Sequence, residues 1–167
     1  MYKNTGKAMC STLKAEVQGF LLSVKLTIQK DSRSEPTWTF STVRDNNMQT
    51  LADLEMKTAE VKDIVLSLTP LDYVRGPIKD RKMVGDLWEF GKEVKGQEVY
   101  IKLKLTGDLK SQNVRVLSFH FPERPINYML SDKSTKEKYG HGDKLPSLRK
   151  SQRNKFNQSG TGNFHSK

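Results

Sequence analysis

The stretch that decides the fold is residues 98–122, EVYIKLKLTGDLKSQNVRVLSFHFP, in which two strand patterns flank a polar turn. In residues 98–106, a tyrosine and two lysines alternate with valine, isoleucine and leucine. Strict alternation over about four to eight residues is typical of a strand with one face on a core. The sequence therefore predicts paired strands over 98–106 and 113–121, joined by the loop 107–112.

The same pattern extends upstream of this pair. Residues 87–94 are predicted to form a strand that reaches 98–106 through a tight turn at 94–97. Three consecutive strands connected in this way form an antiparallel meander. A short strand is predicted at 38–42, and residues 76–86 are predicted to be a charged loop.

The first half of the chain is predicted to be mainly helical. Apolar residues at 13, 17, 20, 21, 24 and 28 have helical spacing, which predicts an amphipathic helix over 13–30. A short helix is predicted over 48–55 with Asn47 as its cap, and another helix starts at Thr58. Helices followed by a meander predict an α+β domain, with the helices packed on an antiparallel sheet.

Composition divides the chain into a domain and two polar ends. The protein has 167 residues and a formal net charge of +10, which favours an anionic partner. Residues 131–167 contain nine Lys or Arg and only three Asp or Glu, so more than half of the excess lies there. We expect a disordered N-terminus over 1–12, one domain over 13–130 and a basic, disordered tail over 131–167.

Several classes of protein are excluded by what the sequence lacks. Cys10 is the single cysteine, so no intrachain disulfide and no cysteine-based zinc site is possible. Two of the three histidines, His141 and His165, lie in the tail, and no signature of a zinc protease, a phosphate-binding loop or a serine hydrolase occurs. We therefore expect no metal and no cofactor. No apolar run approaches a membrane span, and we expect a cytoplasmic protein without membrane contact.

Metal-free cleavage of RNA remains compatible with the residues of the domain. In that reaction the 2′-OH of the RNA is the nucleophile, and the protein supplies a base, an acid and cations for the charge that builds on phosphorus. Residues 73–120 contain Arg, Lys, Glu, Tyr and one histidine, His120. Histidine suits proton transfer near neutral pH.

Strand parity indicates which of these side chains share a face. Tyr100 shares a face with the lysines of its strand, and parity allows Tyr100 and His120 to converge. Parity also predicts that His120 and Ser118 share a face with Val114 and Val116. The lysine row would equally fit a solvated face or protection of an edge strand, and a single histidine at a strand end is often incidental.

Four pieces of the sequence carry a family resemblance through their order and spacing: TLADLEMKTAEVKDIVLSLTPLDYVRGP (50–77), DLWEFGKEV (86–94), EVYIKLKL (98–105) and VRVLSFH (114–120). Together they resemble the MqsR family of toxins from bacterial type II toxin–antitoxin systems. The resemblance covers about residues 13–128. It implies a RelE-like fold, an mRNA endonuclease that inhibits translation, and a cognate antitoxin as partner.

The resemblance also implies roles for four residues. The family's catalytic positions fall on Arg75, Glu89, Tyr100 and His120, with glutamine more familiar at position 89 and lysine at position 120. Arg75 is then expected to stabilise the phosphate, and Tyr100 to stack on a base or orient the substrate. Glu89 and His120 are the expected base and acid, in either order.

Three lysines are expected to add RNA-binding charge. They are Lys92, Lys102 and Lys104, which lie on the strands next to these positions. The differences at positions 89 and 120 leave a second interpretation open. In it, the chain is a catalytically inactive regulator on the same scaffold, which binds RNA or a protein partner. The sequence does not decide the oligomeric state.

Overall fold

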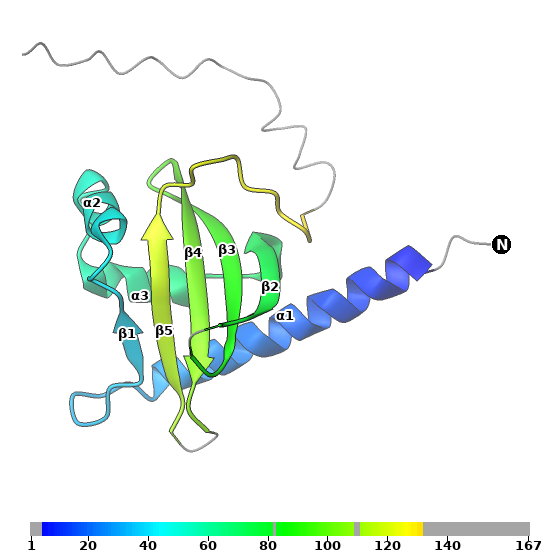
Figure 1. The fold of residues 1–167 in the computed structure, drawn as a ribbon, viewed down its shortest axis with the longest axis horizontal. Helices are drawn as coiled ribbons and strands as arrows, with labels where there is room; N and C mark the ends of the chain where they lie inside the picture. The colour runs from blue at the N-terminus through cyan, green and yellow to red at the C-terminus, as the bar shows by residue number, and fades with distance from the viewer. Residues whose placement is uncertain (1–4, 82, 109–110, 132–167) are drawn as a thin grey trace, which may run out of the picture.

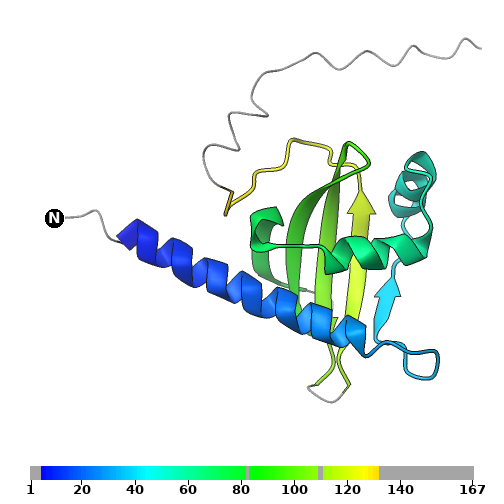
Figure 2. The ribbon, with the colours of Figure 1, turned by 180° about the vertical axis from the view of Figure 1, so that it is seen from behind.

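The computed structural model describes residues 5–81, 83–108 and 111–131, which form a five-stranded sheet with helices on one face (Figure 1). The elements in chain order are α1 (Thr5–Gln29), β1 (Trp38–Phe40), α2 (Asp45–Asp53), α3 (Thr58–Leu66), the 3₁₀ turn η1 (Pro70–Asp72), β2 (Tyr73–Lys79), β3 (Asp86–Val94), β4 (Gln97–Thr106) and β5 (Asn113–His120). Seen from behind, α1 and α3 cross the sheet, and α2 lies beside β5 (Figure 2). The predicted α+β class is confirmed.

The sheet is mostly antiparallel. Its strand order is β1-β5-β4-β3-β2, and each neighbouring pair from β2 to β5 is antiparallel. The predicted three-strand meander is therefore present as β3, β4 and β5. The predicted short strand at 38–42 is also present as β1, and it pairs in parallel with β5. The sheet consequently has five strands where the meander alone predicted three.

Strand β2 was not predicted, because residues 76–86 were expected to form a loop. A Gly-Pro pair commonly marks a turn or loop, yet Gly76 and Pro77 both lie inside β2. Proline has no N–H for a sheet hydrogen bond, and it is tolerated on an edge strand, where one side of the backbone needs no strand partner. β2 is at the edge of the sheet. Of the predicted loop, only the connection between the end of β2 at Lys79 and the start of β3 at Asp86 is present.

A bulge in β5 changes the predicted faces of that strand. Lys102 of β4 pairs with Ser118, whereas the next residue, Leu103, pairs with Val116. Leu117 is thus the extra residue of a β-bulge. The side chains before and after a bulge reverse their parity, so the prediction that Ser118 shares a face with Val116 is wrong. Val116 is fully buried under the helices beside Leu103.

The core lies between the sheet and the helices α1 and α3. Val17 and Val24 of α1 and Val61 and Val65 of α3 are completely buried, as expected for the apolar stripes of both helices. The sheet contributes aromatic rings to the same layer: Phe20 of α1 stacks on Trp88 of β3 with centroids 4.4 Å apart. Burial of these apolar surfaces attaches the helices to the back of the sheet and leaves its front face open.

Helix α1 is longer than its apolar stripe predicts. It begins at Thr5, although residues 1–12 were expected to be disordered. Residue 13 was predicted as the start because it is the first apolar residue of the stripe that faces the sheet. A helix can extend beyond the residues that pack on the core where no cluster of glycine or proline stops it. Within the described residues, no helix combines the length and the apolarity needed to cross a membrane. The predicted basic tail lies outside the described residues from 132 onward.

Asn47 was predicted to cap α2, but it has a different role. It lies inside α2 with none of its surface exposed. Its amide donates to the carbonyls of Ser41 and Leu117 at 2.8 and 3.3 Å, and its Oδ1 accepts from the backbone N–H of Phe119 at 2.9 Å. Asn47 therefore attaches α2 to β5 at the bulge.

Candidate functional site

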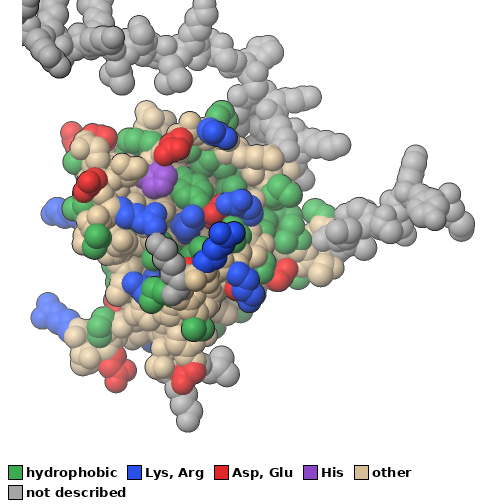
Figure 3. Space-filling view, in the orientation of Figure 1, with side chains coloured by type: hydrophobic (Ala, Val, Ile, Leu, Met, Phe, Trp, Pro, Cys, Tyr) green, Lys and Arg blue, Asp and Glu red, His purple; other side chains and the backbone are tan. Residues whose placement is uncertain are grey.

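The face of the sheet opposite α1 and α3 contains a row of polar side chains from three strands. Glu89 of β3 pairs with Lys102 of β4, which pairs with Ser118 of β5. Tyr100 pairs with His120 one step further along the same two strands. Directly paired residues have their side chains on the same face. Figure 3 shows this face, with Lys and Arg side chains gathered near its centre.

Glu89 is the centre of this arrangement. Its carboxylate is buried and accepts two hydrogen bonds from Arg75, from Nε at 3.0 Å and from Nη2 at 3.1 Å. The Nζ of Lys102 lies 3.2 Å from the same carboxylate. Burial alone would raise the pKa of Glu89, but the hydrogen bonds from Arg75 and Tyr100 and the charge of Lys102 outweigh it and hold the pKa below its ordinary value. Glu89 is an ionised group whose oxygens are already engaged.

Tyr100 lies between Glu89 and His120. Burial raises the pKa of the Tyr100 phenol, and its hydrogen bond to the Glu89 carboxylate raises it further. The phenol therefore keeps its proton and is a hydrogen-bond donor, not a base. The ring of Tyr100 is 5.3 Å from the ring of His120, and the Nζ of Lys102 lies 5.6 Å from its centroid.

His120 is held in one orientation by its own end of β5. Its Nδ1 lies 2.9 Å from the carbonyl oxygen of Phe121. A carbonyl oxygen only accepts, so Nδ1 carries the proton and Nε2 of the neutral ring is free to accept one. The side chain is half-buried and lies at the edge of the polar row. This geometry suits proton transfer at Nε2.

The structure adds Arg44, which the sequence did not single out. Arg44 precedes α2, and its Nη1 donates to the hydroxyl of Ser118 at 3.2 Å. Its charge also acts on Tyr100, where it opposes the rise in the pKa of the phenol. Arg44 and Ser118 are 74 positions apart in the sequence, so no local pattern indicates their contact. We call Arg44, Arg75, Glu89, Tyr100, Lys102 and His120 the open-face cluster.

Two of the predicted RNA-binding lysines lie elsewhere. Lys92 is on the helix-covered side of β3, where its Nζ contacts Asp72 at 3.1 Å. Lys104 is on the open face, but its side chain is 1% exposed and its Nζ lies 2.7 Å from Asp80. The segment between β2 and β3 folds over Lys104, since Met83 also accepts a hydrogen bond from it. Neither charge is presented to solvent beside Tyr100, whereas Lys102 is.

The open-face cluster has the groups for binding an anion and for moving a proton. Arg44 and Lys102 supply positive charge, and His120 supplies a nitrogen with a free lone pair. Among the described residues, no group of three or more His, Cys, Asp and Glu side chains is arranged to hold a metal ion. No family model, no curated protein and no solved structure matches the chain.

Proposed function

We propose that this protein is a metal-independent RNA endonuclease with a RelE-like fold, a toxin of the MqsR type that acts on mRNA in the cytoplasm and is neutralised by a cognate antitoxin. The observation that supports the proposal best is the open-face cluster, in which four residues expected from the resemblance meet. Arg75, Glu89, Tyr100 and His120 come from the four strands β2, β3, β4 and β5, and they lie next to one another across the sheet. Tyrosine and histidine side by side on a cationic surface suit RNA cleavage.

In the proposed reaction, the residues of the cluster have different roles. Nε2 of His120 takes the proton of the 2′-OH as that oxygen attacks phosphorus. Arg44 and Lys102 stabilise the negative charge of the phosphorane. The bond to the 5′-oxygen then breaks, and solvent at the open face protonates this leaving group. The products are a 2′,3′-cyclic phosphate and a 5′-hydroxyl end. Glu89 positions Arg75, Tyr100 and Lys102 and takes no proton itself.

A catalytically inactive binding protein is the second candidate. It is favoured by the Glu89 carboxylate, which already neutralises Arg75 and Lys102 and so reduces the charge available for a phosphorane. Such a protein would bind RNA or a protein partner through the same face. It would release no cleavage products.

Cleavage of defined RNA strands tests the proposal. Purified full-length protein is incubated with end-labelled single-stranded RNA in EDTA, with the 2′-O-methyl form of the same strand as control. We expect cleavage of the unmodified strand only, with cyclic phosphate ends, because the 2′-OH is the nucleophile. Binding of both strands without products would contradict the nuclease and support the second candidate. Cleavage of the 2′-O-methyl strand would exclude the proposed mechanism.

A further inference from the structure

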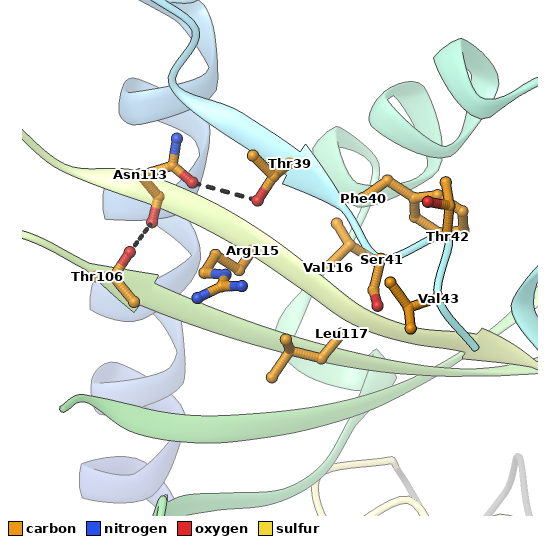
Figure 4. Close-up of a pocket in the computed structure, with 10 residues that line it drawn as sticks. All are labelled: Thr39, Phe40, Ser41, Thr42, Val43, Thr106, Asn113, Arg115, Val116 and Leu117. Carbon is orange, nitrogen blue, oxygen red and sulfur yellow. Dashed lines mark hydrogen bonds between the residues drawn. The ribbon is translucent and has the colours of Figure 1, made fainter. Parts of the chain in front are cut away.

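A groove on the open face lies over the paired strands β1 and β5, next to the open-face cluster. Its volume is about 460 Å³, which is within the usual range of ligand sites. Figure 4 shows its lining, with Thr39 and Asn113 at one end and Val43 and Leu117 at the other. Val43 directly precedes Arg44, and Leu117 directly precedes Ser118. One end of the groove therefore lies one residue along the chain from Arg44 and from Ser118, to which Arg44 donates.

Two arginines of this region have no carboxylate partner among the described residues. Arg115 lines the groove, and its Nη1 has the thioether of Met83 as a neighbour at 3.6 Å. Arg44 donates to the neutral hydroxyl of Ser118. The cations Arg75 and Lys102, by contrast, are paired with Glu89. Arg44 and Arg115 therefore add two cations without a carboxylate partner to the partly exposed Lys102 on this side of the sheet.

The lining of the groove alternates apolar and polar groups. Leu117, the bulged residue, is half-buried, and Val43 is 91% exposed, so the two provide an apolar wall. At the far end, the hydroxyl of Thr39 donates to Oδ1 of Asn113 at 3.4 Å. This pair presents hydroxyl and amide groups to solvent. Between the two ends lies the guanidinium of Arg115.

We propose that this groove binds the single-stranded RNA that flanks the cleaved phosphate. Arg115 contacts one backbone phosphate, Arg44 contacts a phosphate nearer to His120, and a base lies against Leu117 and Val43. The inference rests on the proposed function for its substrate. The strand between Arg115 and Ser118 is about 10 Å long, so the two arginines contact different phosphates of one RNA strand.

Single-stranded RNA suits the groove better than a duplex. Its unpaired bases expose apolar faces that pack against a wall such as Leu117 and Val43, while their edges reach polar groups. A duplex hides those faces and would use the two arginines alone. An acidic peptide would also pair with the arginines, but it would leave the apolar wall without a matching group.

Binding is measured with a fluorescein-labelled, 2′-O-methyl single-stranded RNA of mixed sequence, which the proposed mechanism does not cut. Full-length wild type is compared with Arg115→Gln at several salt concentrations. We expect roughly tenfold weaker binding for a lost charged contact. The slope of log affinity against log salt should fall by about 0.7, the contribution of one phosphate contact to a single strand.

Two further variants distinguish a specific role of Arg115 from the loss of any one positive charge and from misfolding. Lys14→Gln on the exposed side of α1 removes one charge behind the sheet and should bind like wild type. Arg115→Lys keeps the charge and should restore most of the affinity, which a misfolded variant would not do. If Arg115→Gln binds as tightly as Lys14→Gln, or if duplex RNA or an acidic peptide competes better than single-stranded RNA, the inference is wrong.

The outcomes distinguish this inference from the proposed function. If Arg115→Gln cuts unmodified RNA and binds RNA as the wild type does, the groove plays no part and the nuclease stands. If wild type cuts no RNA but its binding depends on Arg115, the groove stands and the nuclease fails.

Discussion

The rings of Tyr100 and His120 lie beside one another across β4 and β5, with centroids 5.3 Å apart and planes inclined by 39°. The hydrogen bond from Nδ1 to Phe121 holds the imidazole from the other side. On its other side, Tyr100 lies close enough to the Glu89 carboxylate for that group to raise the pKa of the phenol. Tyr100 therefore lies between His120 and the ion pair of Glu89 with Arg75.

Replacing His120 tests its role in proton transfer. His120→Gln keeps a polar side chain of similar size but cannot take up a proton. We expect RNA cleavage to fall by about 10²- to 10⁴-fold, the usual contribution of a general base. Affinity for uncut 2′-O-methyl RNA should change little. Cleavage is followed by product formation on gels under single-turnover conditions.

The matched control for His120→Gln is Tyr100→Phe. It retains the ring beside His120 and removes only the phenolic hydroxyl, so cleavage should fall less than in His120→Gln. Equal activity of wild type and His120→Gln would show that His120 transfers no proton.

The lowered pKa of Glu89 predicts how the free energy of unfolding depends on pH. Its pKa in the folded protein is held below its ordinary value, so its contribution is present above the pKa of the unfolded chain and is lost as the pH falls through the folded value. Glu89→Gln should cost about 1–3 kcal/mol near neutral pH. The difference in the free energy of unfolding between wild type and Glu89→Gln should become smaller in acid. Urea unfolding, followed by tryptophan fluorescence at about pH 7 and about pH 3, measures this difference.

Glu93→Gln is the control for this experiment, because Glu93 is an exposed carboxylate on the same strand. It should leave the free energy of unfolding nearly unchanged at both pH values. A stability difference between wild type and Glu89→Gln that stayed constant with pH would contradict the lowered pKa.

Local patterns predicted the elements of this fold better than its contacts. The apolar stripe of α1 and the alternation in β4 depend on side chains close in sequence, and both elements are present. The parity of β5 failed at the bulge, although the sequence carries a signal there: its apolar positions move from Val114 and Val116 to Phe119. An even-to-odd change within one strand indicates an inserted residue.

The predicted site was less accurate where distant segments meet. Lys104 alternates with apolar residues like Lys102, yet the connection between β2 and β3 buries it, and no pattern within β4 predicts this cover. Arg44 was missed for the same reason, since its contact with Ser118 requires the α2 end to lie against β5. Which charges face solvent is decided by such long-range packing.

Asn47 should be essential for the stability of the β5 region. Asn47→Ala would leave the buried backbone N–H of Phe119 without its acceptor and would remove both contacts to backbone carbonyls. A cost of about 2–4 kcal/mol is expected for such unsatisfied groups. Asn46→Ala, on the exposed side of α2, should change the free energy of unfolding by less than about 0.5 kcal/mol. Urea unfolding of both variants tests this, and similar midpoints would contradict the role of Asn47.

Lys102 and Lys104 are two residues apart on the same face of β4, and the structure gives them different roles. Lys102 is 23% exposed beside Tyr100, whereas Lys104 is buried against Asp80. Lys102→Met should weaken RNA binding and reduce its salt slope by about 0.7, as expected for one phosphate contact. Lys104→Met should leave both unchanged and instead destabilise the fold by about 1–3 kcal/mol, because Asp80 loses its partner. Fluorescence anisotropy measures the RNA affinity of the two variants, and urea unfolding measures their stability. A larger loss of RNA affinity in Lys104→Met than in Lys102→Met would mean that the segment over Lys104 opens when RNA binds.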